Sequence, residues 1–268
     1  MRTYYDPTND RLVFEGQPAT KDFWDHQWQT KKFREIVLAG FSDRFVVPLT
    51  KKFLLPEQAT RILEGGCGRG QRVYALAKSG YDAYGIDYAK KTVELINKHF
   101  PELKVTVGDV RKIPFPDQYF DGYWSIGVIE HFFDGYGDIL SEMKRVIKKG
   151  GYLFLIFPYI SPLRQLKIRL GRYPLLPQTF QEQHLYQFAF NDRQVAEKVA
   201  SSGFKLRYRL PYEGFKGLKD EVALLRPMLQ KIYDRPTGIN RIITYALSKL
   251  FAPLASHTIL LVFEKTAR

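Results

Sequence analysis

The residues that most clearly could bind a ligand form a glycine-rich segment, Glu64-Gly65-Gly66-Cys67-Gly68-Arg69-Gly70. It joins a short apolar run at residues 61–66, which ends in glycines, to a helical pattern at residues 69–80. Glycines let the backbone turn sharply and approach a ligand without a Cβ clash. In open α/β sheets, such strand-to-helix turns border the ligand-binding crevice. The segment predicts a cofactor loop, and taken alone it also fits a dinucleotide site or a tight turn.

Acidic groups and a histidine follow the next expected strands. Asp87 ends the second strand, where a carboxylate can accept hydrogen bonds from two ribose hydroxyls, and Asp109 follows the third. Their alternative roles are a helix cap for Asp87 and a turn residue for Asp109. His131, beside Glu130 after the fourth strand, is the candidate general base. The alternative for this pair is to order the turn.

From residue 60 onward, apolar runs alternate with helical patterns. This alternation predicts a parallel sheet with right-handed crossovers. Strands are expected at residues 61–66, 82–87, 103–109, 120–128, 151–158, 204–210 and 257–265, and helices at 69–80, 89–100, 134–151 and 190–204.

The ordered set of the glycine loop, Asp87, Asp109 and the segments 117–132 and 142–155 resembles class I S-adenosylmethionine-dependent methyltransferases, especially the small-molecule branch called type 11. The resemblance covers residues 60–158. It implies an α/β fold: a Rossmann-like, seven-stranded, mostly parallel sheet with helices on both faces. Because residue 71 is Gln, the glycines do not form the G-x-G-x-x-G turn of dinucleotide-binding proteins.

The resemblance also implies a cofactor, S-adenosylmethionine, and residues that hold it. The methionine and ribose part would contact the loop, and the ribose hydroxyls would contact Asp87. The adenine would lie against the residues after the second and third strands. The sulfonium would lie at the end of the fourth strand. The candidate cofactor-binding residues are Glu64, Gly65, Gly66, Cys67, Gly68, Asp87, Tyr88, Asp109, Val110, Ser125, Ile126 and Gly127. Some relatives bind a metal through a glutamate where this chain has Gly127, so no metal is expected.

Two parts of the chain depart from the alternating pattern. Residues 1–59, rich in aromatic and charged side chains, are expected to form a helical N-terminal extension to a methyltransferase domain at residues 60–268. Segments at about 159–190 and 212–256 are expected to be insertions that cover the substrate. Their basic and apolar stretches, at 161–172 and 238–255, are predicted either to lie on a membrane surface or to pack on the core as lid helices.

Composition bounds the setting. The formal net charge of +13 favours anionic partners. A single cysteine, no leader-like N-terminus and no apolar run of about 20 residues predict a cytoplasmic protein, peripheral at most to the inner membrane surface. The oligomeric state is not predicted.

The acceptor is expected to be a small or lipid-linked hydrophobic metabolite that is methylated on oxygen. Nucleic acid is the first alternative, but the Asn/Asp-Pro-Pro-aromatic box of adenine-N6 enzymes is replaced by Ser125-Ile126-Gly127-Val128. A non-catalytic cofactor-binding module is the second alternative, and polyamine-synthase-like chemistry the third.

Overall fold

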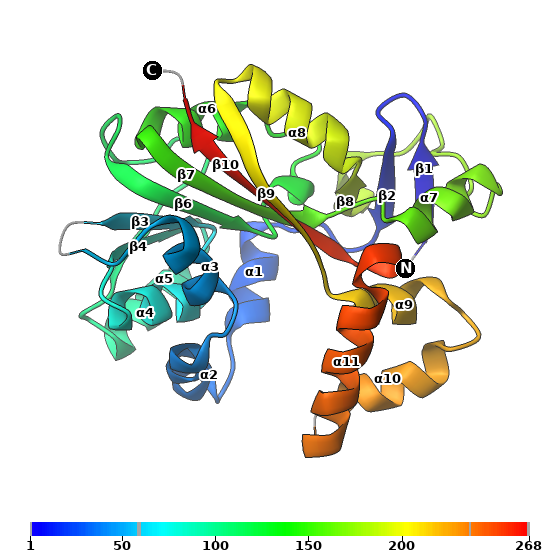
Figure 1. The fold of residues 1–268 in the computed structure, drawn as a ribbon, viewed down its shortest axis with the longest axis horizontal. Coiled ribbons are helices and arrows are strands. Elements are labelled where there is room, and N and C mark those ends of the chain that lie inside the picture. Colours follow the sequence, from blue (N-terminus) through cyan, green and yellow to red (C-terminus); the bar gives the residue numbers. More distant parts are fainter. Residues whose placement is uncertain (1, 58–59, 236, 267–268) are drawn as a thin grey trace.

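The computed structural model describes residues 2–57, 60–235 and 237–266 (Figure 1). The elements in chain order are β1 (Thr3–Asp6), β2 (Arg11–Glu15), α1 (Lys21–Trp28), α2 (Phe33–Ala39), η1 (Gly40–Ser42), α3 (Val46–Phe53), β3 (Arg61–Gly65), α4 (Gln71–Lys78), β4 (Asp82–Asp87), α5 (Lys90–His99), β5 (Lys104–Val107), β6 (Phe120–Ile126), η2 (Ile129–His131), α6 (Gly137–Val146), β7 (Ile147–Pro158), α7 (Pro162–Arg169), η3 (Glu182–His184), β8 (Leu185–Phe190), α8 (Asp192–Ser201), β9 (Phe204–Tyr212), α9 (Gly214–Glu221), α10 (Arg226–Asp234), α11 (Gly238–Ala255) and β10 (Thr258–Lys265).

The main sheet has seven strands in the order β5-β4-β3-β6-β7-β10-β9. The pairs β3–β4, β4–β5, β3–β6 and β6–β7 are parallel, whereas β10 runs antiparallel to both β7 and β9. This confirms the predicted mostly parallel, seven-stranded α/β sheet.

Helices cover both faces because the central strands are apolar on both sides. Along β7, Leu153, Leu155 and Phe157 pack into one core with α6 and α8, while Phe154 and Ile156 pack into another with α4 and α5. Successive strand residues point to opposite faces, so a continuous apolar run fills two cores. Figure 1 shows α6 and α8 on one side of the sheet and α3, α4 and α5 on the other.

Both insertions leave the sheet at the edge where the parallel strands end. Thr258, the first residue of β10, pairs with Pro158 at the end of β7 and with Tyr212 at the end of β9. The segments after β7 and between β9 and β10 therefore start at the carboxyl edge, beside the loops that follow β3, β4 and β6.

The N-terminal extension is not wholly helical, which corrects the prediction for its first part. Residues 3–15 form the hairpin β1–β2, and β2 pairs with β8 to complete a second sheet of three strands. Asp6 orders the turn by accepting hydrogen bonds from the backbone N–H groups of Thr8 and Asn9. The turn is a local signal in the sequence, but the pairing depends on β8, which lies inside the insertion at 159–190.

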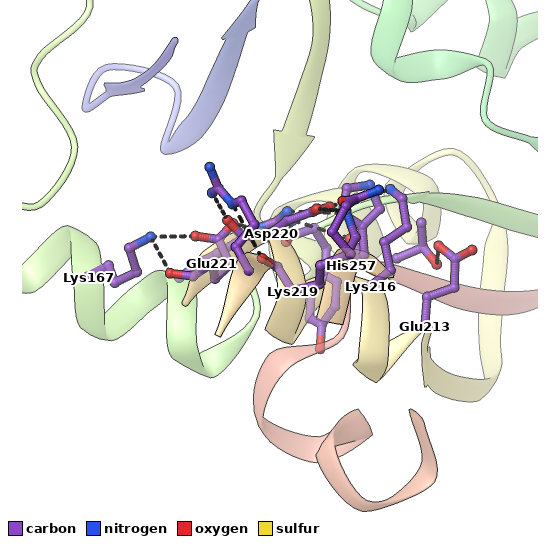
Figure 2. Close-up of polar contacts among 12 residues, drawn as sticks. Lys167, Glu213, Lys216, Lys219, Asp220, Glu221 and His257 are labelled. Carbon is purple, nitrogen blue, oxygen red and sulfur yellow. Dashed lines mark hydrogen bonds and ion pairs between the residues drawn. The ribbon is translucent and has the colours of Figure 1, made fainter. Parts of the chain in front are cut away.

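A buried ion-pair network joins the two insertions. The fully buried Arg164 of α7 donates from Nε to Glu221 of α9 at 2.7 Å and from Nη1 to the carbonyl oxygen of Tyr159 at 2.8 Å. Lys167 and Tyr173 donate to the other Glu221 oxygen. Figure 2 shows Lys167 and Glu221 facing each other at one end of α9. These contacts lower the pKa of Glu221 to about 2 despite its burial.

Replacing Glu221→Gln leaves the Arg164 charge buried without its counter-ion, and we expect it to lower the free energy of unfolding by about 3 kcal/mol. The low pKa of Glu221 adds stability that is present above its unfolded value of 4.5 and is lost as pH falls toward 2. Urea unfolding at neutral pH measures the loss, with Glu197→Gln, an exposed position on α8, as the control. Equal stability of the two variants would contradict the role of this network.

Candidate cofactor site

The glycine loop forms as a sharp turn between β3 and α4. The backbone N–H groups of Gly66 and Cys67 both donate to the carbonyl oxygen of Ile86 in β4, at 2.9 and 3.0 Å. Gly66 has a φ of 72°, and a Cβ added there would lie 2.6 Å from Val128 Cγ2. Any larger residue would be strained in backbone and side chain at once. The glycine therefore lets the loop lie against the segment that follows β6.

Asp87 holds the loop to the end of β4. Its Oδ2 accepts a hydrogen bond from the N–H of Gly68 at 2.8 Å, and its Oδ1 accepts one from the N–H of Ala89 at 2.9 Å. The carboxylate is 4% exposed, and this burial raises its pKa while the two hydrogen bonds act in the opposite direction. Asp87 also caps the turn into α5 through its contact with Ala89, which is the alternative role expected from the sequence.

A cavity of about 670 Å³ opens over this loop. Its size is typical of small-molecule sites. It collects ten of the candidate cofactor-binding and catalytic residues: Gly66, Cys67, Gly68, Asp87, Tyr88, Asp109, Val110, Ile126, Gly127 and His131.

Glu64, Gly65 and Ser125 do not line the cavity and lie in the sheet behind it. Glu64 is 1% exposed, and neither of its carboxylate oxygens has a hydrogen-bond partner among the described residues. The Arg72 guanidinium lies 3.6 Å from Glu64 Oε1, yet burial dominates and raises the pKa of Glu64 to about 7. An incompletely satisfied carboxyl beside a cavity is characteristic of a functional site.

Two tryptophans of α1 cover the cavity, and neither was among the predicted site residues. Trp24 and Trp28 stack with ring centroids 5.2 Å apart, and both line the cavity. The Arg69 guanidinium lies 4.8 Å from the ring centre of Trp28. Their spacing of four residues, which places both on one helix face, is the signal that could have indicated them.

The covering helix α1 is fixed by polar contacts to α5 and to the residue that follows β4. Asp25 of α1 accepts hydrogen bonds from the N–H and hydroxyl of Thr92, at 3.0 and 3.1 Å. Just before α1, the Ala19 carbonyl accepts one from the Tyr88 hydroxyl at 2.7 Å. The N-terminal extension thus forms one wall of the site.

His131 lies in η2, at the end of the cavity that Gly127 borders. Its Nδ1 is 2.7 Å from the carbonyl oxygen of Tyr186. A carbonyl only accepts, so Nδ1 carries the proton and Nε2 presents a lone pair. Burial lowers the pKa of His131 to about 4, so the ring is neutral at pH 7. The Trp24 ring packs against it edge to face at 5.3 Å.

The lining of the cavity is more acidic than basic, whereas the protein as a whole is basic. The lining contains three arginines and six acidic side chains, of which Glu130 alone has a pKa raised to about 8, in a chain with a net charge of +13. One arginine is already engaged, because Arg111 Nη2 lies 2.7 Å from Asp109 Oδ2, and this pairing lowers the pKa of Asp109. Such a lining favours a cationic ligand.

The cavity offers little covalent chemistry of its own. Cys67 is buried, and desolvation holds its pKa well above the usual value, so its thiol is not activated. What the site provides is a carboxylate at a turn, an aromatic cover and a neutral histidine. This combination suits the transfer of a group that is already activated on a cofactor, with alignment and exclusion of water supplied by the protein.

The central part of the chain matches a known family. Residues 63–155 match the family model described as a methyltransferase domain, type 11. A protein of Mycolicibacterium smegmatis named as a probable S-adenosylmethionine-dependent methyltransferase is 31% identical over 97 residues, or 36% of this chain and 37% of the relative. Residues 63–155 are thus a class I S-adenosylmethionine-dependent methyltransferase domain of the type 11 branch, as predicted.

Other relatives differ in what their names say they act on. A mouse protein named as probable tRNA methyltransferase 9B is 33% identical over 132 residues, covering 48% of this chain and 28% of the relative. The malonyl-[acyl-carrier protein] O-methyltransferase of Herminiimonas arsenicoxydans is 27% identical over 169 residues, covering 63% and 61%. The chain therefore spans less than two thirds of the length of these relatives.

The fold also resembles solved structures. The phosphoethanolamine N-methyltransferase 2 of Haemonchus contortus, in complex with S-adenosyl-L-methionine, superposes with a TM-score of 0.51 at 16% identity, covering 92% of this chain and 60% of that one. This likeness concerns the fold. The roles of single residues stay predictions.

The raised pKa of Glu130, about 8, gives a prediction about stability. Its side chain is buried, and its Oε2 has no hydrogen-bond partner among the described residues. The folded protein holds this proton more tightly than the unfolded chain does. Its contribution to stability is therefore present below the unfolded value of 4.5 and is lost as pH rises toward 8.

Glu130→Gln removes this titration, so the variant should gain stability relative to the parent protein when the pH is raised from 5 to 8. Denaturant unfolding at both pH values measures the change, again with Glu197→Gln as the control. If the difference between parent and Glu130→Gln is the same at both pH values, Glu130 does not titrate in this range.

Proposed function

We propose that the protein is a methyltransferase that moves the methyl group of S-adenosylmethionine to an oxygen atom of a small or lipid-linked hydrophobic acceptor. The observation that supports this most is the acid-rich cavity in which the glycine loop, Asp87 and His131 meet. In this proposal residues 60–268 are the catalytic domain and residues 1–59 its cover. A cytoplasmic location, with contact to the inner membrane surface, belongs to the same proposal.

The cofactor would lie along the loop in the orientation that the family implies. The loop from Glu64 to Gly68 would hold the methionine part, with the negative potential of the lining facing the ammonium and sulfonium charges. Asp87 would accept from the ribose hydroxyls with the lone pairs that Gly68 and Ala89 leave free. Tyr88, Asp109 and Val110 would enclose the adenine, and the segment Ser125–Gly127 would border the sulfonium.

When bound, the cofactor would supply a methyl group that is already activated by the sulfonium, for transfer to the acceptor oxygen. His131 Nε2 is free to accept the acceptor's hydroxyl proton, since Nδ1 is engaged by Tyr186. Trp24 and Trp28 exclude water from the reacting atoms. A carboxylate acceptor would need no base.

The acceptor end of the cavity favours a compact apolar molecule. Phe132, Phe133 and Leu185 line the cavity together with His131, and Trp24 packs edge to face on the histidine ring. The similarity to a malonyl-[acyl-carrier protein] O-methyltransferase supports oxygen as the target. RNA is the second candidate, which the net charge of +13 and the similarity to a probable tRNA methyltransferase support.

Calorimetric titration with S-adenosylmethionine and S-adenosylhomocysteine tests the cofactor site. Asp87→Asn removes a charged hydrogen-bond acceptor worth about 1.5–3 kcal/mol, so we expect affinity to fall roughly 10- to 100-fold. The control is Asp117→Asn, whose side chain is 73% exposed. No binding by the parent protein would refute the proposed function, and unchanged binding by Asp87→Asn would refute this residue's role.

The acceptor class is tested by the release of S-adenosylhomocysteine in the presence of a long-chain phenol, a malonyl thioester and bulk tRNA. Release with either of the first two supports a small hydrophobic acceptor. Release with tRNA alone would replace the proposal by its alternative. Binding of cofactor without release from any acceptor class would indicate a non-catalytic module.

His131→Ala should lower kcat about 100-fold with little change in KM if the histidine accepts a hydroxyl proton. Because the pKa of His131 is lowered to about 4, the rate should show no inflection from this group between pH 5 and 8. The measurement is the pH profile of kcat, with a hydroxyl acceptor identified by the release of S-adenosylhomocysteine. A titration near 6.5 that disappears in His131→Ala would contradict the buried, neutral ring.

A further inference from the structure

Helix α11 exposes apolar side chains where a surface helix normally exposes polar ones. Leu250, Ile239 and Ile242 are each 69% exposed, and Tyr245 is 62% exposed. With Leu254 they recur at intervals of three to five residues, which places them on one outward stripe. The opposite side of α11 is already packed against the rest of the protein, so the stripe is a second apolar face of the helix.

The inner side of α11 packs closely on α9. Leu247 and Phe251 join a core with Phe215 and Leu218. A Cβ added at Gly217 would overlap the carbonyl oxygen of Ala255. Because α9 is in turn fixed by the Arg164–Glu221 pair, α11 is held in one orientation with its apolar stripe outward. Figure 1 shows α11 projecting beyond the main sheet with α10 beside it.

The exposed apolar surface continues onto α10 and the turn before it. Leu224 is 89% exposed, Met228 56% and Tyr233 45%. Together, residues 222–255 hold eight of the seventeen large apolar side chains that are exposed in the described part of the chain. Exposed apolar patches of this kind mark interaction sites.

The charges that flank this surface are almost all positive. Residues 222–255 contain five basic residues, Arg226, Lys231, Arg235, Arg241 and Lys249, and one acidic residue, Asp234. Asp234 accepts a hydrogen bond from Gln230. A basic rim around apolar side chains is complementary to an anionic lipid surface, where headgroups meet acyl chains. A second copy of the same basic face would instead be repelled.

A second cavity opens beside the stripe. It has a volume of about 410 Å³ and lies between the start of α9, α10 and α11. Lys216 and Arg241 line it, with one acid, Glu213, and the rings of Tyr233 and Tyr245. Glu213 accepts a hydrogen bond from Thr258 at 3.3 Å, and Lys216 reaches Asp220 only at 3.9 Å. Among the described residues, the Arg241 guanidinium has no ion pair or hydrogen bond.

Figure 2 shows Glu213 and Lys216 close together at the end of α9 that is remote from Lys167. The cavity therefore holds two cations against one acid, together with the ring of Tyr245 on the exposed stripe and that of Tyr233 on α10. An anionic headgroup can enter such a cavity while its chains stay against the stripe.

We propose that the surface formed by Leu224, Met228, Tyr233, Ile239, Ile242, Tyr245, Leu250 and Leu254, here called the α10–α11 face, docks on an anionic lipid surface, with one phosphate headgroup held between Lys216 and Arg241. The partner is a bilayer leaflet rich in anionic phospholipid. Because no helix among the described residues is long and apolar enough to span a bilayer, the contact is interfacial. This inference rests on the proposed function: docking would bring a lipid-linked acceptor to the insertion between β9 and β10, which starts at the carboxyl edge of the sheet.

Sedimentation with vesicles tests the docking. The full chain should bind vesicles of phosphatidylglycerol and phosphatidylcholine at least about tenfold more tightly than vesicles of phosphatidylcholine alone, and less tightly as salt rises. Ile242→Glu with Leu250→Glu should lose about tenfold or more of this affinity. The matched control is Leu175→Glu, at an apolar position that is 67% exposed outside the α10–α11 face.

The cavity is tested separately by Lys216→Gln with Arg241→Gln. This variant should lose the preference for anionic vesicles, and inorganic phosphate alone should compete poorly with them. If inorganic phosphate competes as well as the anionic vesicles themselves, the cavity is a phosphate site that takes no part in lipid docking.

Three results would overturn the proposal: no vesicle binding by the parent chain, equal loss in Leu175→Glu, or a dimer that Ile242→Glu dissociates, which would make the face a contact between copies. All variants are also titrated with S-adenosylmethionine, which none of the substituted residues contacts in the proposed site. Lost docking with intact cofactor binding separates a failure of this inference from a failure of the proposed function.

Discussion

The site depends on one constraint, the reversal of strand order beside β3. The chain adds β4 and β5 on one side of β3 and β6 and β7 on the other. The loops after β3 and β6 therefore diverge and leave a crevice at the carboxyl edge, which is where ligands bind in open α/β sheets. The glycine loop, Asp87 and His131 come from three different strand ends. They meet only because this reversal places those ends next to one another.

Asp87 is the residue that fixes the position of the glycine loop at the edge of the sheet. A buried carboxylate is costly unless hydrogen bonds satisfy it, and Asp87 receives them from Gly68 and Ala89. The same contacts fix the loop after β3 relative to the end of β4. Asp87 therefore has a structural role beside the ribose contact proposed for it, which is why a calorimetric measurement of cofactor affinity has to be paired with a measure of folding.

The sequence was sufficient for the parts of the site that are local. The glycine loop and the strand ends carry their signals within a few residues, so the seven strands and ten of the residues on the cavity wall could be predicted. The β1–β2 hairpin could not be assigned, because its partner β8 lies in a distant insertion. Trp24 and Trp28 were missed for a similar reason, since their place on the cavity wall depends on the packing of α1 on the glycine loop, where Trp28 lies against Gly68.

The division of charge connects the cofactor site with the outer surface. A cavity with more acidic than basic side chains attracts a cationic cofactor, while the surrounding chain is strongly basic. These opposite signs are kept apart by the fold, because the acids follow the central strands and the exposed cations of the α10–α11 face lie on the insertion between β9 and β10. Both groups reach the same edge of the sheet, since β9 and β10 are paired so that their connection emerges there. In the proposed function, a hydrophobic acceptor held at an anionic surface would then arrive beside a cationic cofactor, and the insertion between β9 and β10 would decide which acceptor is presented.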